Sequence, residues 1–225
     1  MTLRLVVFDV DGTLVDSQAD ILAAMSAAFA GEGLEAPTRS DVLGIVGLSL
    51  PQAMMVLAPN RDDASQTRMV EGYKAAYMDL RARSGVEVSS PLYPHVRDTL
   101  ETLHAQPTTL LGLATGKSRR GLDKLVDGHG IRPMFVTQQC ADDHPSKPHP
   151  SMLFSAMGDA GVEAPRAVMI GDTSFDMEMA RAAGMTGIGV SWGYHSRDRL
   201  RDAHVVIDDI RALPEVLDTI WRQEP

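Results

Sequence analysis

Short apolar runs alternate with amphipathic segments along most of the chain, and this alternation predicts strands separated by helices. Each run is mostly apolar and is followed by a turn signal, which is typical of a strand buried on both faces of a sheet. The first run is the clearest, because it ends abruptly at Asp9. Predicted strands cover residues 3–8, 110–114, 167–170 and 186–190, with a weaker fifth at 204–207.

The segments between the predicted strands carry apolar residues at helical spacing. Val96, Leu100 and Leu103 illustrate the pattern, since they fall on one face of a helix. Strands that alternate with helices predict an α/β fold, a doubly wound parallel sheet with helices on both faces. Predicted helices cover residues 96–104, 119–129, 151–160 and 175–183, and we expect a solvated, charged helix over 196–204.

One long stretch interrupts the alternation, because residues 18–89 show helical patterns and no convincing strand. An all-helical insert directly after the first strand predicts a lid or cap domain over 18–89. The core would then consist of residues 1–17 and 90–225. Within the insert, helices are expected at residues 21–30, 41–46, 52–57 and 62–83.

Composition and charge narrow the class of protein. With 225 residues and 44% hydrophobic content, the chain is expected to form one or two soluble globular domains. A net charge of −9 argues against nucleic acid or an anionic membrane as a partner, but it does not disfavour small phosphate ligands. The single cysteine, Cys140, excludes an intrachain disulfide and is expected to be buried. We expect a cytoplasmic protein, because the first apolar run is too short for a signal peptide or membrane span.

Acids and hydroxyls follow the ends of the predicted strands. Asp9 and Asp11 come after the first strand, Thr115 after the second and Asp172 after the third. The carboxyl ends of parallel strands meet at one edge of the sheet, where ligands bind in this class of fold. Lys147, in the loop before residue 151, has a route to the same edge, although Lys117 competes for the cationic role.

These residues suit phosphoryl transfer. Two charges among Asp9, Asp11 and Asp172 would repel by about 4 kcal/mol at roughly 4 Å, and a hard cation would relieve this. Oxygen ligands without histidine or cysteine favour Mg²⁺ held by these three residues. One carboxylate could attack phosphorus while its neighbour moves the proton. Gly12 has no side chain to block the approach of the phosphate to the backbone.

Each of these motifs, taken alone, also has a purely structural interpretation. The DVDG turn could be a surface turn, and Asp172 or Thr173 could simply cap a helix. Thr115 and Lys147, taken singly, are equally compatible with a helix cap and a solvated loop. Their ordered placement after successive strands favours a single site over these separate explanations.

With these residues the chain resembles the haloacid dehalogenase-like hydrolase superfamily over residues 5–217, nearest its phosphoglycolate phosphatase-like members. The stretch DVDGTLVDS resembles the first family motif, which implies Asp9 as nucleophile and Asp11 as general acid and base. LATGKS resembles the second motif and implies that Thr115 donates a hydrogen bond to the phosphate.

The other two motifs lie later in the chain. SKPHP resembles the third and implies Lys147 as the electrostatic stabiliser. IGDTSFDMEMARAAGM resembles the fourth and implies Asp172 as a Mg²⁺ ligand with Asp176 as its supporting acid. The resemblance also implies that the metal takes the backbone carbonyl of Asp11.

The family resemblance explains the helical insert as a mobile cap that closes over the site. The stretch GIVGLSL matches the cap loop that faces the site in relatives, so Gly47, Leu48 and Ser49 are candidate specificity residues. The second motif usually reads Thr-Asn-Lys, and Gly116 replaces the asparagine here. Together with Gly12, Gly116 is a candidate substrate-binding position.

These expectations point to a phosphomonoester hydrolase that acts on a small phosphorylated metabolite, with phosphoglycolate as one candidate, through an aspartyl-phosphate. Asp11 argues against dehalogenation, because a halide leaves without a proton. A β-phosphoglucomutase-like mutase and an inorganic pyrophosphatase remain enzymatic alternatives. A phospho-accepting receiver module is the alternative from another class, although it is about half this length and lacks the insert. The oligomeric state is not readable from the sequence.

Overall fold

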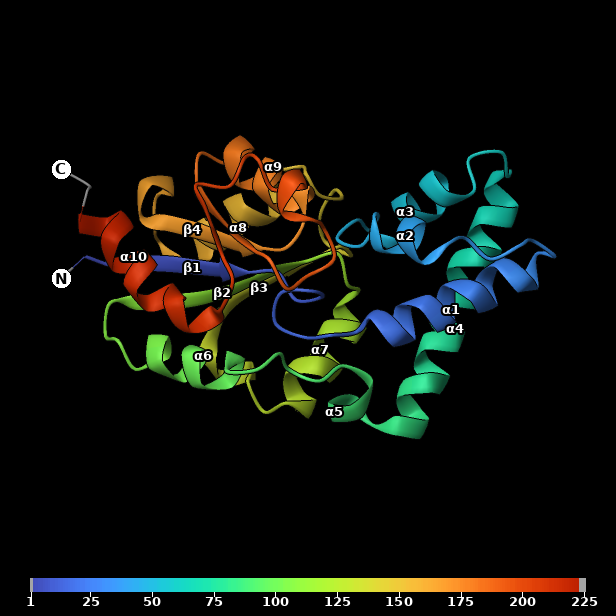
Figure 1. Cartoon of the computed structure of the whole chain (residues 1–225), viewed down its shortest axis with the longest axis horizontal. Coiled ribbons are helices and arrows are strands. Elements are labelled where there is room, and N and C mark those ends of the chain that lie inside the picture. The colour runs from blue at the N-terminus through green and yellow to red at the C-terminus, as the bar shows by residue number, and fades with distance from the viewer. Residues whose placement is uncertain (1, 223–225) are drawn as a thin grey trace.

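The computed structural model describes residues 2–222, and its core is a six-stranded parallel sheet with the order β3-β2-β1-β4-β5-β6 (Figure 1). Every neighbouring pair of strands is parallel, so the predicted doubly wound α/β fold is confirmed. The strands are β1 (Arg4–Phe8), β2 (Thr109–Thr115), β3 (Phe135–Cys140), β4 (Ala167–Gly171), β5 (Thr186–Val190) and β6 (Val205–Ile207).

The central strand β1 is buried on both faces, as its apolar sequence predicts. Val6 and Phe8 face one hydrophobic cluster, and Leu5 and Val7 face the other, because side chains alternate along a strand. Cys140, at the end of β3, is buried in the first of these clusters as expected.

Helices cover both faces of the sheet (Figure 1). Residues of α6 (Val96–His104), α7 (Arg119–Gly128) and α10 (Leu213–Arg222) belong to the cluster on one face. Residues of α8 (Ser151–Ala160) and α9 (Ser174–Ala182) belong to the cluster on the other. The helices predicted over residues 96–104, 119–129, 151–160 and 175–183 are therefore present within a few residues of their expected ends.

A strand and a ten-residue helix of the core were not predicted, and one predicted helix is wrong. Strand β3 was missed because its FVTQQC sequence is polar in the middle, and α10 was missed although it is amphipathic. Residues 196–204 do not form the expected helix, since only one 3-10 turn, Arg197–Arg199, is present. Leu200 is the one buried hydrophobic residue of that stretch, which leaves a helix without an apolar face to bury.

The insert after β1 is helical, as predicted, and we call it the cap (Figure 1). Its helices share a hydrophobic cluster of their own, which includes Met25, Met54 and Met69. Within residues 2–222, no helix combines the length and apolar character needed to cross a membrane. The cap consists of α1 (Gln18–Gly31), α2 (Arg39–Leu43), α3 (Leu50–Leu57), α4 (Asp63–Ser84) and α5 (Val86–Ser89).

The register of the sheet determines where the candidate residues meet. Phe8 pairs with Leu113 of β2 on one side and with Ile170 of β4 on the other. Asp9 follows Phe8 directly, and Thr115 and Asp172 each lie two residues beyond the paired position. All three therefore lie at the carboxyl edge of the central strands, beneath the cap.

Candidate active site

A buried ammonium group between two carboxylates forms the centre of the site. Nζ of Lys147 donates to Oδ1 of Asp9 and to Oδ1 of Asp176, each at 2.6 Å. The Lys147 side chain is 0% exposed, so water cannot screen these ion pairs. Burial alone would lower the pKa of Lys147, but Asp176 and Asp9 outweigh it and raise this pKa above its usual range. Lys147 is therefore a fixed positive charge beside Asp9.

Asp172 adds a third carboxylate to the same cluster. Oxygen atoms of Asp9, Asp172 and Asp176 lie within 4.8 Å of one another. Oδ1 of Asp172 accepts a hydrogen bond from Oγ1 of Thr13 at 3.0 Å, and Oδ2 accepts one from the backbone N–H of Tyr194 at 2.8 Å. Burial, and then the charges of Asp9 and Asp176, raise the pKa of Asp172 well above its usual value.

Glycines make room for these acids. A Cβ atom on Gly12 would lie 2.2 Å from Oδ2 of Asp172, and one on Gly193 would lie 2.1 Å from Cβ of Asp172. Gly12 also has a φ of +84°, a region that favours glycine. The structure thus places Gly12 against Asp172, and its contact with substrate stays a prediction.

The acidic cluster fits a divalent cation. Oδ2 of Asp9 is buried and has no hydrogen-bond partner among residues 2–222, although buried polar atoms normally have one. Burial raises the pKa of Asp9 to about 7, against the opposing effect of Lys147. A cation would favour the ionised carboxylate and satisfy the unpartnered oxygen. Oδ1 of Asp176 is paired with the ammonium group of Lys147, whereas Asp9 keeps an unpartnered oxygen and Asp172 has no ion pair within residues 2–222. Asp9 and Asp172 are therefore the better ligands.

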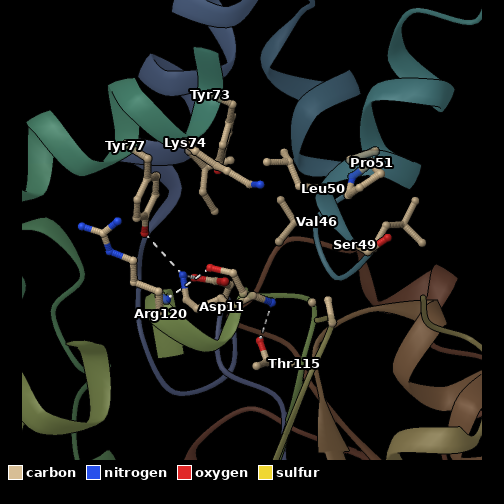
Figure 2. A pocket seen from close by; sticks show the side chains of 18 of the residues that line it. Asp11, Val46, Ser49, Leu50, Pro51, Tyr73, Lys74, Tyr77, Thr115 and Arg120 are labelled. Atoms are coloured by element: carbon tan, nitrogen blue, oxygen red, sulfur yellow. Dashed lines mark hydrogen bonds and ion pairs between the residues drawn. The ribbon is translucent and has the colours of Figure 1, made fainter. Parts of the chain in front are cut away.

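Asp11 points away from this cluster and into a pocket. Its Oδ1 lies 2.8 Å from Nζ of Lys117 and accepts a hydrogen bond from Oγ of Ser17. Nζ of Lys117 also donates to the hydroxyl of Tyr77, a cap residue, at 3.3 Å (Figure 2). Lys117 and Lys147 therefore do not compete, since each is paired with its own carboxylate. The expected contact between the metal and the backbone carbonyl of Asp11 stays a prediction.

Thr115 and Gly116 form the floor of the pocket at the end of β2. Thr115 is 1% exposed, and its Oγ1 accepts a hydrogen bond from the backbone N–H of Lys117 at 3.2 Å (Figure 2). A Cβ atom on Gly116 would lie 2.6 Å from the carbonyl oxygens of both Gly47 and Leu48. Gly116 thus allows the cap to approach the core closely.

The pocket is a cavity of about 450 Å³ between the cap and the core, and Asp9 and Asp11 line it. Figure 2 shows Tyr73, Lys74 and Tyr77 on cap helix α4, with Asp11, Thr115 and Arg120 contributed by the core. The candidate specificity residues Gly47, Leu48 and Ser49 also line this cavity. Thr115, a predicted catalytic residue, and the cap loop therefore line the same cavity.

A histidine that the sequence analysis missed connects the cap loop to the core. Nδ1 of His195 accepts a hydrogen bond from the backbone N–H of Ser174 at 3.1 Å, so the proton lies on Nε2. Nε2 then donates to the carbonyl of Gly44 in the cap at 3.1 Å. Burial lowers the pKa of His195 to about 4, so the ring is neutral at pH 7. Nearby, the backbone N–H of Ser49 donates to Oγ of Ser146 at 2.8 Å.

Comparisons with known proteins agree with this geometry. The family model for haloacid dehalogenase-like hydrolases matches residues 6–190. A Dickeya dadantii protein named "Probable phosphatase IndB" is 36% identical over 211 residues, which cover 91% of this chain and 89% of the relative. A phosphoglycolate phosphatase of Pseudomonas fluorescens (strain Pf0-1) is 34% identical over 220 residues, which cover 96% of this chain and 80% of the relative.

Solved structures share the complete fold. A hydrolase from Pseudomonas syringae has a TM-score of 0.84 at 24% identity, covering 96% of this chain and 99% of its own. A β-phosphoglucomutase from Clostridium difficile has a TM-score of 0.84 at 18% identity, covering 99% of this chain and 98% of its own. At such identities the likeness shows the fold alone, whereas the family model and the sequence relatives carry the assignment. The chain therefore belongs to the haloacid dehalogenase-like hydrolase family, in its phosphoglycolate phosphatase-like branch, as its four motifs predicted.

Proposed function

We propose that this phosphatase is a Mg²⁺-dependent phosphomonoesterase that acts on a small phosphorylated metabolite through an aspartyl-phosphate. The observation that carries the proposal is the different environment of the two carboxylate oxygens of Asp9. One of its oxygens is held by Lys147, and the other is buried without a partner in a cluster with Asp172. Relatives named phosphoglycolate phosphatase support 2-phosphoglycolate as a candidate substrate.

The first chemical step uses Asp9 as nucleophile and Asp11 as acid. A carboxylate oxygen of Asp9 forms a bond to phosphorus while the bond from phosphorus to the leaving oxygen breaks. Asp11 lines the same cavity, where it would give a proton to the leaving alkoxide. Lys147 fixes the Asp9 carboxylate and offsets the charge of the incoming phosphate. Mg²⁺, when held by Asp9 and Asp172, would offset the remaining negative charge.

The second step releases phosphate. Asp11, now ionised, takes a proton from a water molecule that attacks phosphorus, and the bond to Asp9 breaks. Lys117 and Ser17 hold Asp11 at the edge of the cavity for both steps. Over both steps, the leaving alcohol gains the proton that Asp11 gave, and the phosphoryl group is bonded to the oxygen of the water molecule. Asp11 is protonated again and Asp9 is free.

The cap over residues 18–89 supplies the upper wall of this site. Its loop reaches the core at Gly116 and Ser146, so it closes the cavity above Asp9. We propose that Leu48 and Ser49 take part in selecting the leaving group and that the cap moves to admit it.

Phosphate release from 4-nitrophenyl phosphate tests the proposed function. We expect turnover by the wild type with Mg²⁺, and its loss with a chelator or in Asp9→Asn. Asp98→Asn is the matched control, since Asp98 is an exposed acid on α6. Turnover that persists with chelator, or full activity of Asp9→Asn, would contradict the proposal. The mutase alternative would instead give an isomerised sugar phosphate with little free phosphate.

A further inference from the structure

One wall of the cavity is basic. Lys117 immediately precedes Ser118, the residue that caps α7, and Arg120 and Lys124 follow within the helix. All three basic residues line the cavity, as does Lys74 from cap helix α4 (Figure 2). The cations of α7 therefore extend outward from the position of Asp11, which Lys117 contacts.

Arg120 and Lys124 are not neutralised by neighbouring acids. The chain has 30 acidic and 21 basic residues, so basic side chains have many possible partners. The side chains of Arg120 and Lys124, both exposed, nevertheless make no hydrogen bond or ion pair with any group of residues 2–222. The acids of the same helix, Asp123 and Asp127, pair instead with Arg132.

The acids that line the cavity are also occupied. Asp9 is paired with Lys147, Asp11 with Lys117, and Glu71 of the cap with Lys74. Oδ2 of Asp142 accepts from the backbone N–H of Arg119 at 2.8 Å. Positive charge on the outer wall is thus left available for a ligand, and the N-terminal end of α7 adds to it.

The position of this charge identifies what it would bind. The phosphate under attack belongs beside Asp9. Arg120 and Lys124 lie on the following helix α7, about one turn apart, which is about 6 Å along the helix axis. A guanidinium group and an ammonium group at this spacing suit a carboxylate or a phosphate. The cavity of about 450 Å³ has room for a leaving group that extends from the phosphate beside Asp9 to Arg120 and Lys124.

We propose that Arg120 and Lys124 bind a second anionic group on the leaving-group side of the substrate. This inference rests on the proposed phosphatase function, because it concerns the substrate of the same site. The shared chemistry is a carboxylate or a second phosphate, separated from the reacting phosphate by a short linker. A substrate with only one anionic group leaves this subsite empty.

The test compares three substrates with the double variant Arg120→Gln/Lys124→Gln. They are 4-nitrophenyl phosphate with one anionic group, 2-phosphoglycolate with an added carboxylate, and 1,2-ethanediol bisphosphate with an added phosphate. We expect the wild type to prefer one of the last two, which identifies the second group. In the double variant, the ratio of kcat/KM for that substrate to kcat/KM for 4-nitrophenyl phosphate should fall about ten-fold or more, mainly through KM.

Arg166→Gln is the matched control, because Arg166 is exposed and has no ion pair within residues 2–222. This control should leave the ratio unchanged. A double variant that folds normally and keeps the wild-type ratio overturns the subsite, as does equal loss on all three substrates. Failure of the wild type to hydrolyse any of the three would instead overturn the proposed function.

Discussion

Gly116 lies so close beneath Gly47 that a Cβ atom on Gly116 would be 2.6 Å from the Gly47 carbonyl oxygen. The contact is between backbone atoms, so a rotamer change cannot relieve it. The family resemblance leads one to expect asparagine at position 116, and this arrangement of cap and core has no room for that side chain. Glycine at this position therefore allows a closer approach of the cap loop to the end of β2.

Substitution at Gly116 should weaken closure of the cap. We expect Gly116→Ala, and more strongly Gly116→Asn, to lower kcat/KM by about ten-fold, since the cap loop must move outward to avoid the new side chain. Steady-state kinetics with 4-nitrophenyl phosphate would measure the effect. Gly158→Ala is the control, because a Cβ atom there meets nothing within 4 Å. Wild-type kinetics in both Gly116 variants would show that this close approach is not needed for turnover.

Removal of the buried ammonium group should cost both stability and activity. Lys147→Met leaves Asp9 and Asp176 buried without their shared cation, and the loss of one partner from a buried pair costs about 3–5 kcal/mol. We expect a lower free energy of unfolding in urea and a loss in kcat of about 100-fold or more.

The exposed Arg61 provides the comparison for Lys147, since Arg61→Met also exchanges a cation for methionine. Arg61→Met should have the same free energy of unfolding and the same kcat as the wild type. If Lys147→Met were equally unaffected, the ion pairs at 2.6 Å would have no importance for folding or for the reaction.

The sequence predicts the central part of this fold well because the strands that position the site are apolar and buried. Residues 5–8 of β1 are completely buried, and this burial is visible as an unbroken apolar run. Strand β3 was not recognisable in the same way. Its Gln139 is buried, but the side-chain amide donates to Thr137 and Asp159, so the polar residue is satisfied only in the folded protein. Helix α10 had a readable signal, since Leu213, Leu217 and Trp221 repeat at helical spacing.

The candidate site was likewise predictable only in part. Asp9, Thr115 and Asp172 could be placed together because each follows a predicted strand of a parallel sheet. The partners of Lys117 and Lys147 could not be predicted, since they depend on the paths of two loops and on the position of Tyr77 in the cap. The link from His195 to Gly44 joins residues 151 positions apart and has no local pattern.

Mg²⁺ should stabilise the protein, and more strongly at neutral than at acid pH. The pKa of Asp9 is raised in the folded state, so the contribution of this group to stability is greatest below about pH 4 and is lost as the pH rises towards 7. A cation bound beside the ionised carboxylate reverses that loss. We therefore expect Mg²⁺ to raise the Tm by several degrees at pH 7.5 and by less at pH 5.

The metal ligands can be tested in the same measurement. Asp172→Asn should abolish the rise in Tm with Mg²⁺, whereas Asp98→Asn should keep it. A shift of the same size in Asp172→Asn would place the cation elsewhere than in the cluster of Asp9, Asp172 and Asp176.

His195 should make the protein less stable in mild acid. Burial, with a further effect from Arg199, lowers the pKa of His195 to about 4 from its usual 6.5. The unfolded chain therefore binds a proton more readily than the folded chain between these values. Stability from this group is fully present above about pH 6.5 and is lost as the pH falls towards 4.

His195→Asn separates this effect from general acid unfolding, because asparagine can still accept from Ser174 but does not titrate. We expect the wild type to lose about 1–2 kcal/mol more than the variant between pH 7.5 and pH 5 in urea unfolding, after allowance for solvent screening. His104→Asn, at an exposed position of α6, should behave like the wild type. Equal pH dependence in His195→Asn and the wild type would mean that His195 is protonated without cost, although protonation removes the acceptor of the Ser174 N–H.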